Sequence, residues 1–525
     1  MKRIALYLAL TLLLAACAPR RPIQTDSTAT EASATASAVA EKAESVEIVK
    51  AEEPDYDAEQ RRRLAEIRQR RYRLLERKKR RLEEQLIAWG VRFPQTGLFV
   101  PYQRDQLAYW DAKIEKMQSA IQTLEKLVDE KAIEVTVREI SGQTAKLRRL
   151  ELKKKIEFNT LSRSELMGYL MKALDKEIPP QEMQATEFIL THIGLTPFDL
   201  NLREVLLGFY TDQVGGLYDD ESKKLYVMED FPLKQELSRV ILAHEICHAI
   251  QDQYYDLLNW EIHPNNIDEE GGNDDRAMAA ACVAEGDATI LMGEWAAQNL
   301  SIGVLLDLPK YLSLNQKAMS SAPQPLIDMF IFPYMSGMYF MQTLRLEEFE
   351  RPGLYEQPFM HRPESTEQIM HPEKYYIFPD PPTPVTLVDI SKSLDDGWQR
   401  ELTNVMGESM IKLMFNQCCG VETAYDAHVG WDGDRLELYR HTDGGWLFGW
   451  VTVWDSPHDA EQFQAAYEQK IEWHKQRCAD AGRPEPFGSM TRNGAVVIIA
   501  EGSAREPVEA WLEQAQKQAA NIDFK

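Results

Sequence analysis

Residues 233–258 read LKQELSRVILAHEICHAIQDQYYDLL, and their apolar side chains recur at the three- and four-residue spacing of a helix with one buried face. His244 and His248 both fall on this face, one helical turn apart. Side chains four residues apart project in the same direction, so the two imidazoles can converge on one metal ion. The segment therefore predicts a helix that carries two metal ligands into the protein interior.

The acid between the histidines completes the pattern H-E-x-x-H. Glu245 directly follows the first histidine, so its carboxylate can reach a metal-bound water without binding the metal itself. In a chain with ten histidines among 525 residues, the pattern arises by chance about once in a hundred sequences. We predict that the ion is Zn²⁺ and that Glu245 is a general base. The ordinary alternative is a pair of hydrogen-bonded core histidines.

A catalytic zinc site usually has three protein ligands, and residues 274–288 (DDRAMAAACVAEGDA) offer the third. This alanine-rich stretch predicts a helix that packs closely on another, and Glu285 on its small-residue face needs a partner there. With the H-E-x-x-H pattern, the segment resembles the gluzincin zinc peptidases, whose third ligand is a glutamate from a second helix. The resemblance implies that His244, His248 and Glu285 hold the zinc.

The number of residues between His248 and Glu285 is larger than in the thermolysin-like pattern of that family. Three other acids therefore remain candidates for the third ligand: Asp274, Asp275 and Glu294. Asp275 and Asp287 can instead accept a hydrogen bond that fixes the tautomer of a ligand imidazole, or can be helix-cap and surface acids.

Two shorter segments belong to the expected site. Residues 215–228 predict two short strands around a polar turn. Zincins place an edge strand there, and an extended peptide can add to such an edge. Residues 365–375 (STEQIMHPEKY) are similar to a segment of uncharacterised bacterial H-E-x-x-H proteins, a resemblance that covers about residues 155–380. In a peptidase, His371 or Tyr375 can donate to the oxyanion of the reaction, whereas the simpler role for His371 is a loop-fixing hydrogen bond.

The N-terminus predicts an export signal. Two basic residues precede an apolar run too short to span a membrane permanently, and residues 14–17 read LAAC. This resembles a bacterial lipobox, which implies cleavage after residue 16, acylation of Cys17 and, because Ala18 follows, an outer-membrane location facing the periplasm. The alternative is a plain signal peptidase site. Residues 17–57 are rich in Ala, Ser, Thr, Glu and Pro and predict a disordered tether.

The charge is unevenly distributed. The chain has 59 Lys and Arg against 83 Asp and Glu, a formal net charge of -24 that argues against nucleic acid as a partner. Residues 61–81 are nevertheless strongly basic, within a predicted helical, coiled-coil-like arm over 58–150. This basic face can dock to anionic lipid headgroups or to a protein partner. We favour a solvated face that the protein's own acids neutralise.

The C-terminal part predicts a small α+β domain with two hairpins, each followed by a helix. The expected elements are a helix at 400–415, strands at 434–439 and 446–454, a helix at 458–477, a strand at 495–500 and a helix from 506. The histidines of this part show no ligand spacing and are expected to be structural: His428, His441, His458 and His474. Five thiols remain once Cys17 is set aside, so they cannot all pair within one chain.

Together these patterns predict an α+β chain with a mainly helical, zincin-like core. The expected parts are a signal at 1–16, the tether at 17–57, the arm at 58–150, the core at 151–381 and the α+β domain at 382–525. The expected function is a zinc metallopeptidase of the bacterial envelope that acts on protein or peptide substrates. The alternatives are an inactive zinc-binding scaffold or partner-binding lipoprotein, and a hydrolase of another envelope amide.

Overall fold

The computed structural model describes residues 131–213, 216–229, 236–260, 272–301 and 322–519, with scattered positions between 62 and 119. The chain divides into two compact units, one covering Pro19–Val137 and a larger one covering Arg138–Lys525. The predicted signal, Cys17, the tether and most of the arm with its basic stretch 61–81 lie outside the described residues. The scattered positions described in the arm are helical.

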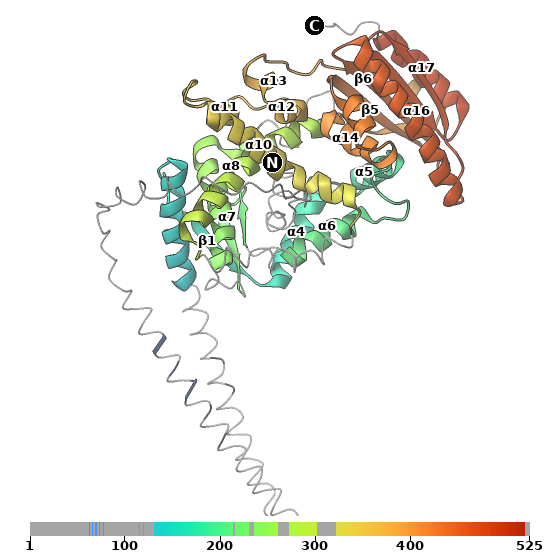
Figure 1. Ribbon diagram of the computed structural model, residues 1–525. Coiled ribbons are helices and arrows are strands. Elements are labelled where there is room, and N and C mark those ends of the chain that lie inside the picture. Colours follow the sequence, from blue (N-terminus) through green and yellow to red (C-terminus); the bar gives the residue numbers. More distant parts are fainter. Residues whose placement is uncertain are drawn as a thin grey trace, which may run out of the picture. The chain divides into compact units, whose positions relative to one another are not determined.

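The larger unit is α+β, as predicted, and it begins with the last turns of a helix that spans 131–148 (Figure 1). The elements that follow are β1 (Glu157–Leu161), α4 (Arg163–Glu177), α5 (Pro180–His192), α6 (Leu202–Gln213), β2 (Gly216–Asp219), β3 (Lys224–Met228), α7 (Glu236–Tyr255), α8 (Asp274–Asn299), α10 (Gln324–Glu347), α11 (Gln357–Met360), α12 (Thr366–Met370) and α13 (Glu373–Tyr376). The C-terminal elements are β4 (Trp398–Asn404), α14 (Gly407–Cys418), α15 (Val421–His428), β5 (Trp431–His441), β6 (Trp446–Trp454), α16 (Pro457–Asp480), β7 (Phe487–Asn493), β8 (Val496–Gly502) and α17 (Arg505–Ala519).

A small sheet lies beside the H-E-x-x-H helix. Its strand order is β1-β3-β2, with β1 parallel and β2 antiparallel to β3. The two strands predicted over 215–228 are therefore confirmed as β2 and β3, and β2 is an edge strand of this sheet. Helix α7 packs against both.

Helices α7, α8 and α10 pack together, with α8 in contact with both others. Small residues let α8 and α10 approach closely: a Cβ atom at Gly286 would lie 2.2 Å from the carbonyl carbon of Gly337. A Cβ atom at Gly337 would in turn lie 2.1 Å from the carbonyl oxygen of Cys282. Both distances are well inside van der Waals contact, so this crossing requires glycine on both helices. It sets the position of the neighbouring Glu285.

This crossing supports a stability prediction. We expect Gly337→Ala to destabilise the fold by about 3 kcal/mol or more, because the added methyl group meets backbone that cannot rotate away. The control is Gly293→Ala on α8, where a Cβ atom would meet nothing within 4 Å. That change should stabilise the fold by about 0.5–1 kcal/mol through helix propensity. Urea unfolding of both variants measures the difference, and equal effects would contradict the close crossing.

The C-terminal sheet has five antiparallel strands in the order β4-β5-β6-β8-β7. Successive residues of β6 face opposite sides: Trp450 packs with Phe463 of α16, whereas Val451 packs in a cluster with Trp511 of α17. A Cβ atom at Gly449 would lie 2.2 Å from the Trp511 ring, so α17 sits directly on the strand. The sheet is thus covered by helices on both faces, and the two predicted hairpins with their following helices are confirmed.

The prediction of a helix over 400–415 is wrong in its first part. Residues Trp398–Asn404 form β4, which pairs with β5, and the helix α14 begins only at Gly407. Arg400 contacts Glu437 of the neighbouring strand, with 2.7 Å between Nη1 and Oε1. This partner is remote in sequence, and local residue spacing cannot reveal it.

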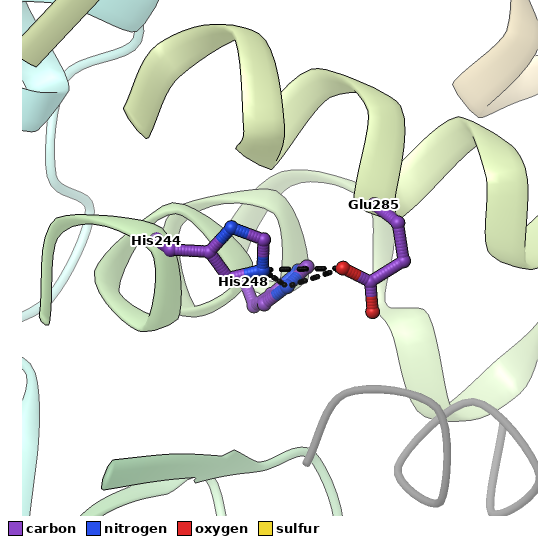
Figure 2. A group of neighbouring side chains, drawn as sticks. All are labelled: His244, His248 and Glu285. Atoms are coloured by element: carbon purple, nitrogen blue, oxygen red, sulfur yellow. Dashed lines mark hydrogen bonds and ion pairs between the residues drawn. The ribbon is translucent and has the colours of Figure 1, made fainter. Parts of the chain in front are cut away.

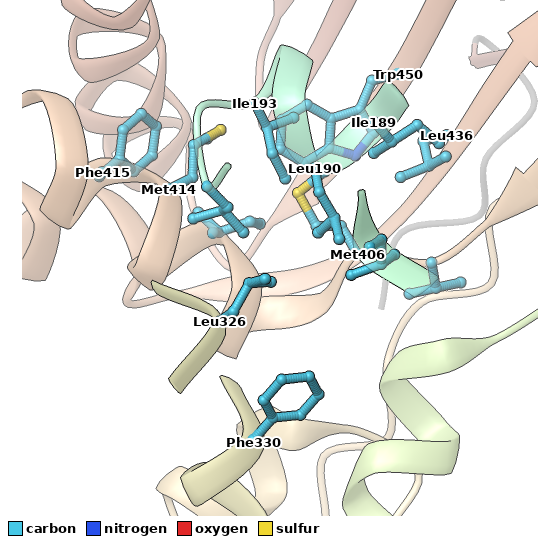
Figure 3. Packing of buried hydrophobic residues seen from close by; sticks show 14 of the residues in the cluster. Ile189, Leu190, Ile193, Leu326, Phe330, Met406, Met414, Phe415, Leu436 and Trp450 are labelled. Carbon is cyan, nitrogen blue, oxygen red and sulfur yellow. The ribbon is translucent and has the colours of Figure 1, made fainter. Parts of the chain in front are cut away.

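One hydrophobic core joins the predicted peptidase segment to the C-terminal sheet. Figure 3 shows Ile189 of α5 and Phe330 of α10 in the same cluster as Met414 of α14 and Trp450 of β6. The predicted boundary at residues 381 and 382 therefore separates segments that share a core. Helix α10 contributes to this core. No helix among the described residues has the length and apolar character needed to cross a membrane.

Candidate metal centre

The two histidines of α7 and Glu285 of α8 point toward one another in the interior (Figure 2). All three side chains have zero exposure. Their ligand atoms lie within 4.8 Å of one another. Helix periodicity places His244 and His248 side by side on α7, and the close packing of α8 brings Glu285 opposite them.

The spacing of the three donor atoms suits a small tetrahedral cation. His244 Nε2 lies 2.9 Å from His248 Nε2 and 3.1 Å from Glu285 Oε2, and the third edge, from His248 Nε2 to Glu285 Oε2, is 3.6 Å. Ligands bound to tetrahedral Zn²⁺ at its usual distances lie about 3.3 Å apart. In addition, Glu285 Oε1 and His244 Nδ1 are buried without a hydrogen-bond partner among the described residues. The donor set therefore fits zinc.

The protonation of the three groups also suits a cation. Burial lowers the pKa of His244 to about 4, so this ring is neutral and keeps a lone pair at neutral pH. Burial opposes charge on Glu285, but His248 and His244 outweigh it and lower the pKa of the carboxyl group. Burial likewise opposes the protonated form of His248, yet Glu285 raises the pKa of this ring. The Glu285 carboxylate is thus held next to the rings of His244 and His248. A dication bound among them can replace the proton that the lowered pKa of Glu285 and the raised pKa of His248 place between these two groups.

Gln251 fixes the tautomer of His248. Its amide nitrogen donates to the carbonyl oxygen of Ala284 at 2.9 Å and to Asp287 Oδ2 at 2.8 Å, which orients the side chain. The amide oxygen must then accept from His248 Nδ1, 2.9 Å away. With the proton on Nδ1, the lone pair of His248 lies on Nε2, the atom that faces His244 and Glu285. The sequence pattern did not reveal this role of Gln251, although its position three residues after His248 was the available signal.

Asp287 connects Gln251 to a buried polar network. Arg148, from the end of the helix over 131–148, donates from Nε to Asp287 Oδ2 at 2.8 Å, and Tyr355 donates to Oδ1 at 2.6 Å. Arg148 also forms two hydrogen bonds with Glu356. We predicted that Asp287 can accept a hydrogen bond from a ligand imidazole; among the described residues it accepts instead from Gln251, Arg148 and Tyr355.

Loss of the Gln251 amide should weaken the metal centre. We expect Gln251→Ala to lower zinc affinity by about 10- to 100-fold, because His248 is no longer held in the tautomer that presents Nε2. The control is Gln253→Ala on the same helix, whose amide contacts the exposed Lys154. Competition with a chromophoric zinc chelator measures both affinities. An unchanged affinity for Gln251→Ala would show that the ring is oriented without this residue.

The carboxylate of Glu245 faces the edge strand rather than the three donors. Its Oε2 accepts the backbone N–H of Tyr218 in β2 at 2.9 Å. The Tyr218 hydroxyl group donates to Asp252 of α7 at 2.7 Å, which also ties the strand to the helix. Glu245 therefore lies between β2 and the two histidines of its own helix. In this position it can exchange a proton with a molecule bound along β2 or beside the histidines.

The three alternative third ligands have other partners. Asp274 accepts a hydrogen bond from Asn404 at 2.7 Å, and Asp275 accepts two from Thr366. Glu294 forms an ion pair with Arg345 at 2.6 Å. Among the described residues, only Glu285 of these acids groups with the histidines.

His371 and Tyr375 are bound in other clusters. His371 Nε2 lies 2.9 Å from Glu408 Oε1 of α14, which also contacts His428 at 2.8 Å. The Tyr375 hydroxyl group donates to the carbonyl oxygen of His361 at 2.6 Å. These contacts match the loop-fixing alternative for His371, and the oxyanion role stays a prediction.

A second group of acids has the spacing of a metal site: Glu367, Asp380 and Asp455. The ammonium group of Lys374 lies among them, 2.6 Å from Glu367, 2.7 Å from Asp455 and 3.1 Å from Asp380. This lysine supplies the positive charge that a cation would supply, so the cluster is an ion-pair network.

Comparison with known proteins bears on the C-terminal sheet alone. No curated protein and no solved structure matches the chain. A family model described as a domain of unknown function (DUF8575) matches residues 395–511, which run from just before β4 into α17 and exclude the metal centre.

Proposed function

We propose that this chain is a zinc-dependent metallopeptidase with a zincin-like core, anchored in the bacterial envelope through Cys17. The observation that carries the proposal is the convergence of His244, His248 and Glu285, with donor spacings of 2.9–3.6 Å in the protein interior. The neighbouring Glu245 and the edge strand β2 supply the other two elements that such a site needs: a base and a backbone edge for the substrate.

The residues have distinct roles in this proposal. His244, His248 and Glu285 would hold Zn²⁺, which when bound supplies a Lewis acid that makes water more acidic and polarises a carbonyl group. Glu245 accepts the proton from the attacking water and returns it to the leaving amine. The edge strand β2 orients an extended peptide through its backbone groups. The Tyr218 N–H of this strand donates to Glu245 at 2.9 Å, so the strand backbone adjoins the base.

A second candidate is a zinc-stabilised scaffold or partner-binding lipoprotein. The observation that favours it is burial, because both histidines, Glu245 and Glu285 have zero exposure. A structural zinc site is closed in this way. It has no need of an acid at Glu245, however, and this acid is what favours a hydrolase.

The test uses the full-length protein with zinc as the only added metal. We expect one zinc per chain and cleavage of a mixed peptide library that is lost with a chelator and restored by zinc. Stoichiometric zinc without cleavage of peptides or envelope proteins would favour the scaffold. Cleavage confined to digested cell-wall muropeptides would favour the amide hydrolase.

A further inference from the structure

Two adjacent cysteines lie at the C-terminal end of α14, far in sequence from the metal centre. Cys418 is the last residue of the helix, Cys419 follows it, and their Sγ atoms are 2.7 Å apart. The sulfurs need to approach by less than about 1 Å to reach the ~2.05 Å of a disulfide bond. Both residues are only half-buried, so a small reagent can reach them.

Backbone acceptors hold both sulfurs in place. Cys418 Sγ lies 3.7 Å from the carbonyl oxygens of Met414 and Phe415, and Cys419 Sγ lies 3.6 Å from that of Ala466 on α16. The other described cysteines are more deeply buried and lie on other helices: Cys247, Cys282 and Cys478. Among the described cysteines, Cys418 and Cys419 are thus the pair whose sulfurs already lie in contact. The N-terminal signal predicts an oxidising compartment, where such a pair can form a disulfide.

We propose that Cys418 and Cys419 are a redox-active dithiol that disulfide exchange converts into a vicinal disulfide. The oxidant is a small or protein disulfide. Its S–S bond breaks and one S–S bond forms between Cys418 and Cys419. The two thiol protons end on the two sulfurs of the reduced oxidant, so atoms and electrons balance. The proposal does not depend on zinc or on peptidase activity.

The exchange has two steps. Burial raises the pKa of both thiols, so the thiolate that starts the exchange is a minor species at neutral pH. One of the two sulfurs attacks the oxidant to form a mixed disulfide. The other sulfur, which lies 2.7 Å away before the reaction, then displaces the oxidant's second sulfur.

The experiment uses the full chain, incubated with either oxidised glutathione or dithiothreitol in the presence of a chelator. After unfolding and alkylation with iodoacetamide, trypsin releases residues 413–435, which contain both cysteines. We expect this peptide to be unalkylated and two hydrogen masses lighter after oxidation, and alkylated on both cysteines after reduction. Cys478→Ser is the control and should leave this result unchanged.

Single variants test the mixed disulfide. Cys418→Ser should accumulate glutathione on Cys419, and Cys419→Ser should accumulate it on Cys418, because the second thiol is missing in each. Absence of glutathione from both variants would show that the pair does not react by disulfide exchange. Full alkylation of 413–435 after oxidation, or a cross-link from this peptide to another, would overturn the vicinal disulfide.

Discussion

We expect Glu245→Gln to bind zinc as the parent protein does and to hydrolyse peptides about 10²- to 10⁴-fold more slowly, the range that loss of a general base produces. Glutamine has nearly the same shape, and its amide oxygen can still accept the Tyr218 N–H that Glu245 now accepts at 2.9 Å. It cannot take up a proton at neutral pH. The fold and the three metal ligands should therefore persist while the chemical step fails.

The measurement is kcat on a peptide that the parent cleaves, together with zinc content and melting temperature. The control is Glu236→Gln on the same helix, whose carboxylate contacts Ser301 at the surface. This control should keep the parent's kcat. Parent-like cleavage by Glu245→Gln would exclude Glu245 as the base, even if the zinc site is present.

Glu285→Gln should lose zinc. Among the three donors, only Glu285 carries a negative charge. Glutamine in its place is neutral, so the charge of a zinc ion bound in this buried site would have no anionic ligand to balance it. We expect zinc affinity to fall by more than about 100-fold, beyond the range for losing a residue that only orients a ligand. Because zinc at about 1,000 times its Kd stabilises a fold by about 4 kcal/mol, the increase in melting temperature on adding zinc should also disappear.

The matched control is Glu294→Gln on the same helix, since Glu294 pairs with Arg345 near the surface. Its zinc affinity should equal that of the parent. If Glu285→Gln keeps the parent's affinity while a variant of Asp274 or Asp275 loses it, the third ligand is one of those acids. If no variant changes the affinity, any bound zinc lies elsewhere.

The arrangement around Asp287 could not be predicted in full from the sequence. Gln251 and His248 are three residues apart on α7, so helix periodicity alone places them together. Arg148, by contrast, is 139 residues from Asp287, and their contact depends on how the first helix of the larger unit packs on α8. For the same reason the contact of His371 with Glu408 could not be predicted, because Glu408 comes from α14, which begins at Gly407 rather than at residue 400.

The sequence by itself determined the features that depend on spacing along one element. These are the helix that presents His244 and His248, the hairpin that precedes it and the alternation of strands and helices after residue 430. Tertiary structure decided which of four acids joins the histidines, because the α8 crossing at Gly286 and Gly337 turns Glu285 toward α7. The physical reason is the sequence distance over which each effect acts. The periodicity of a helix or strand fixes the directions in which its own side chains point, whereas only close packing brings side chains from different elements within bonding distance.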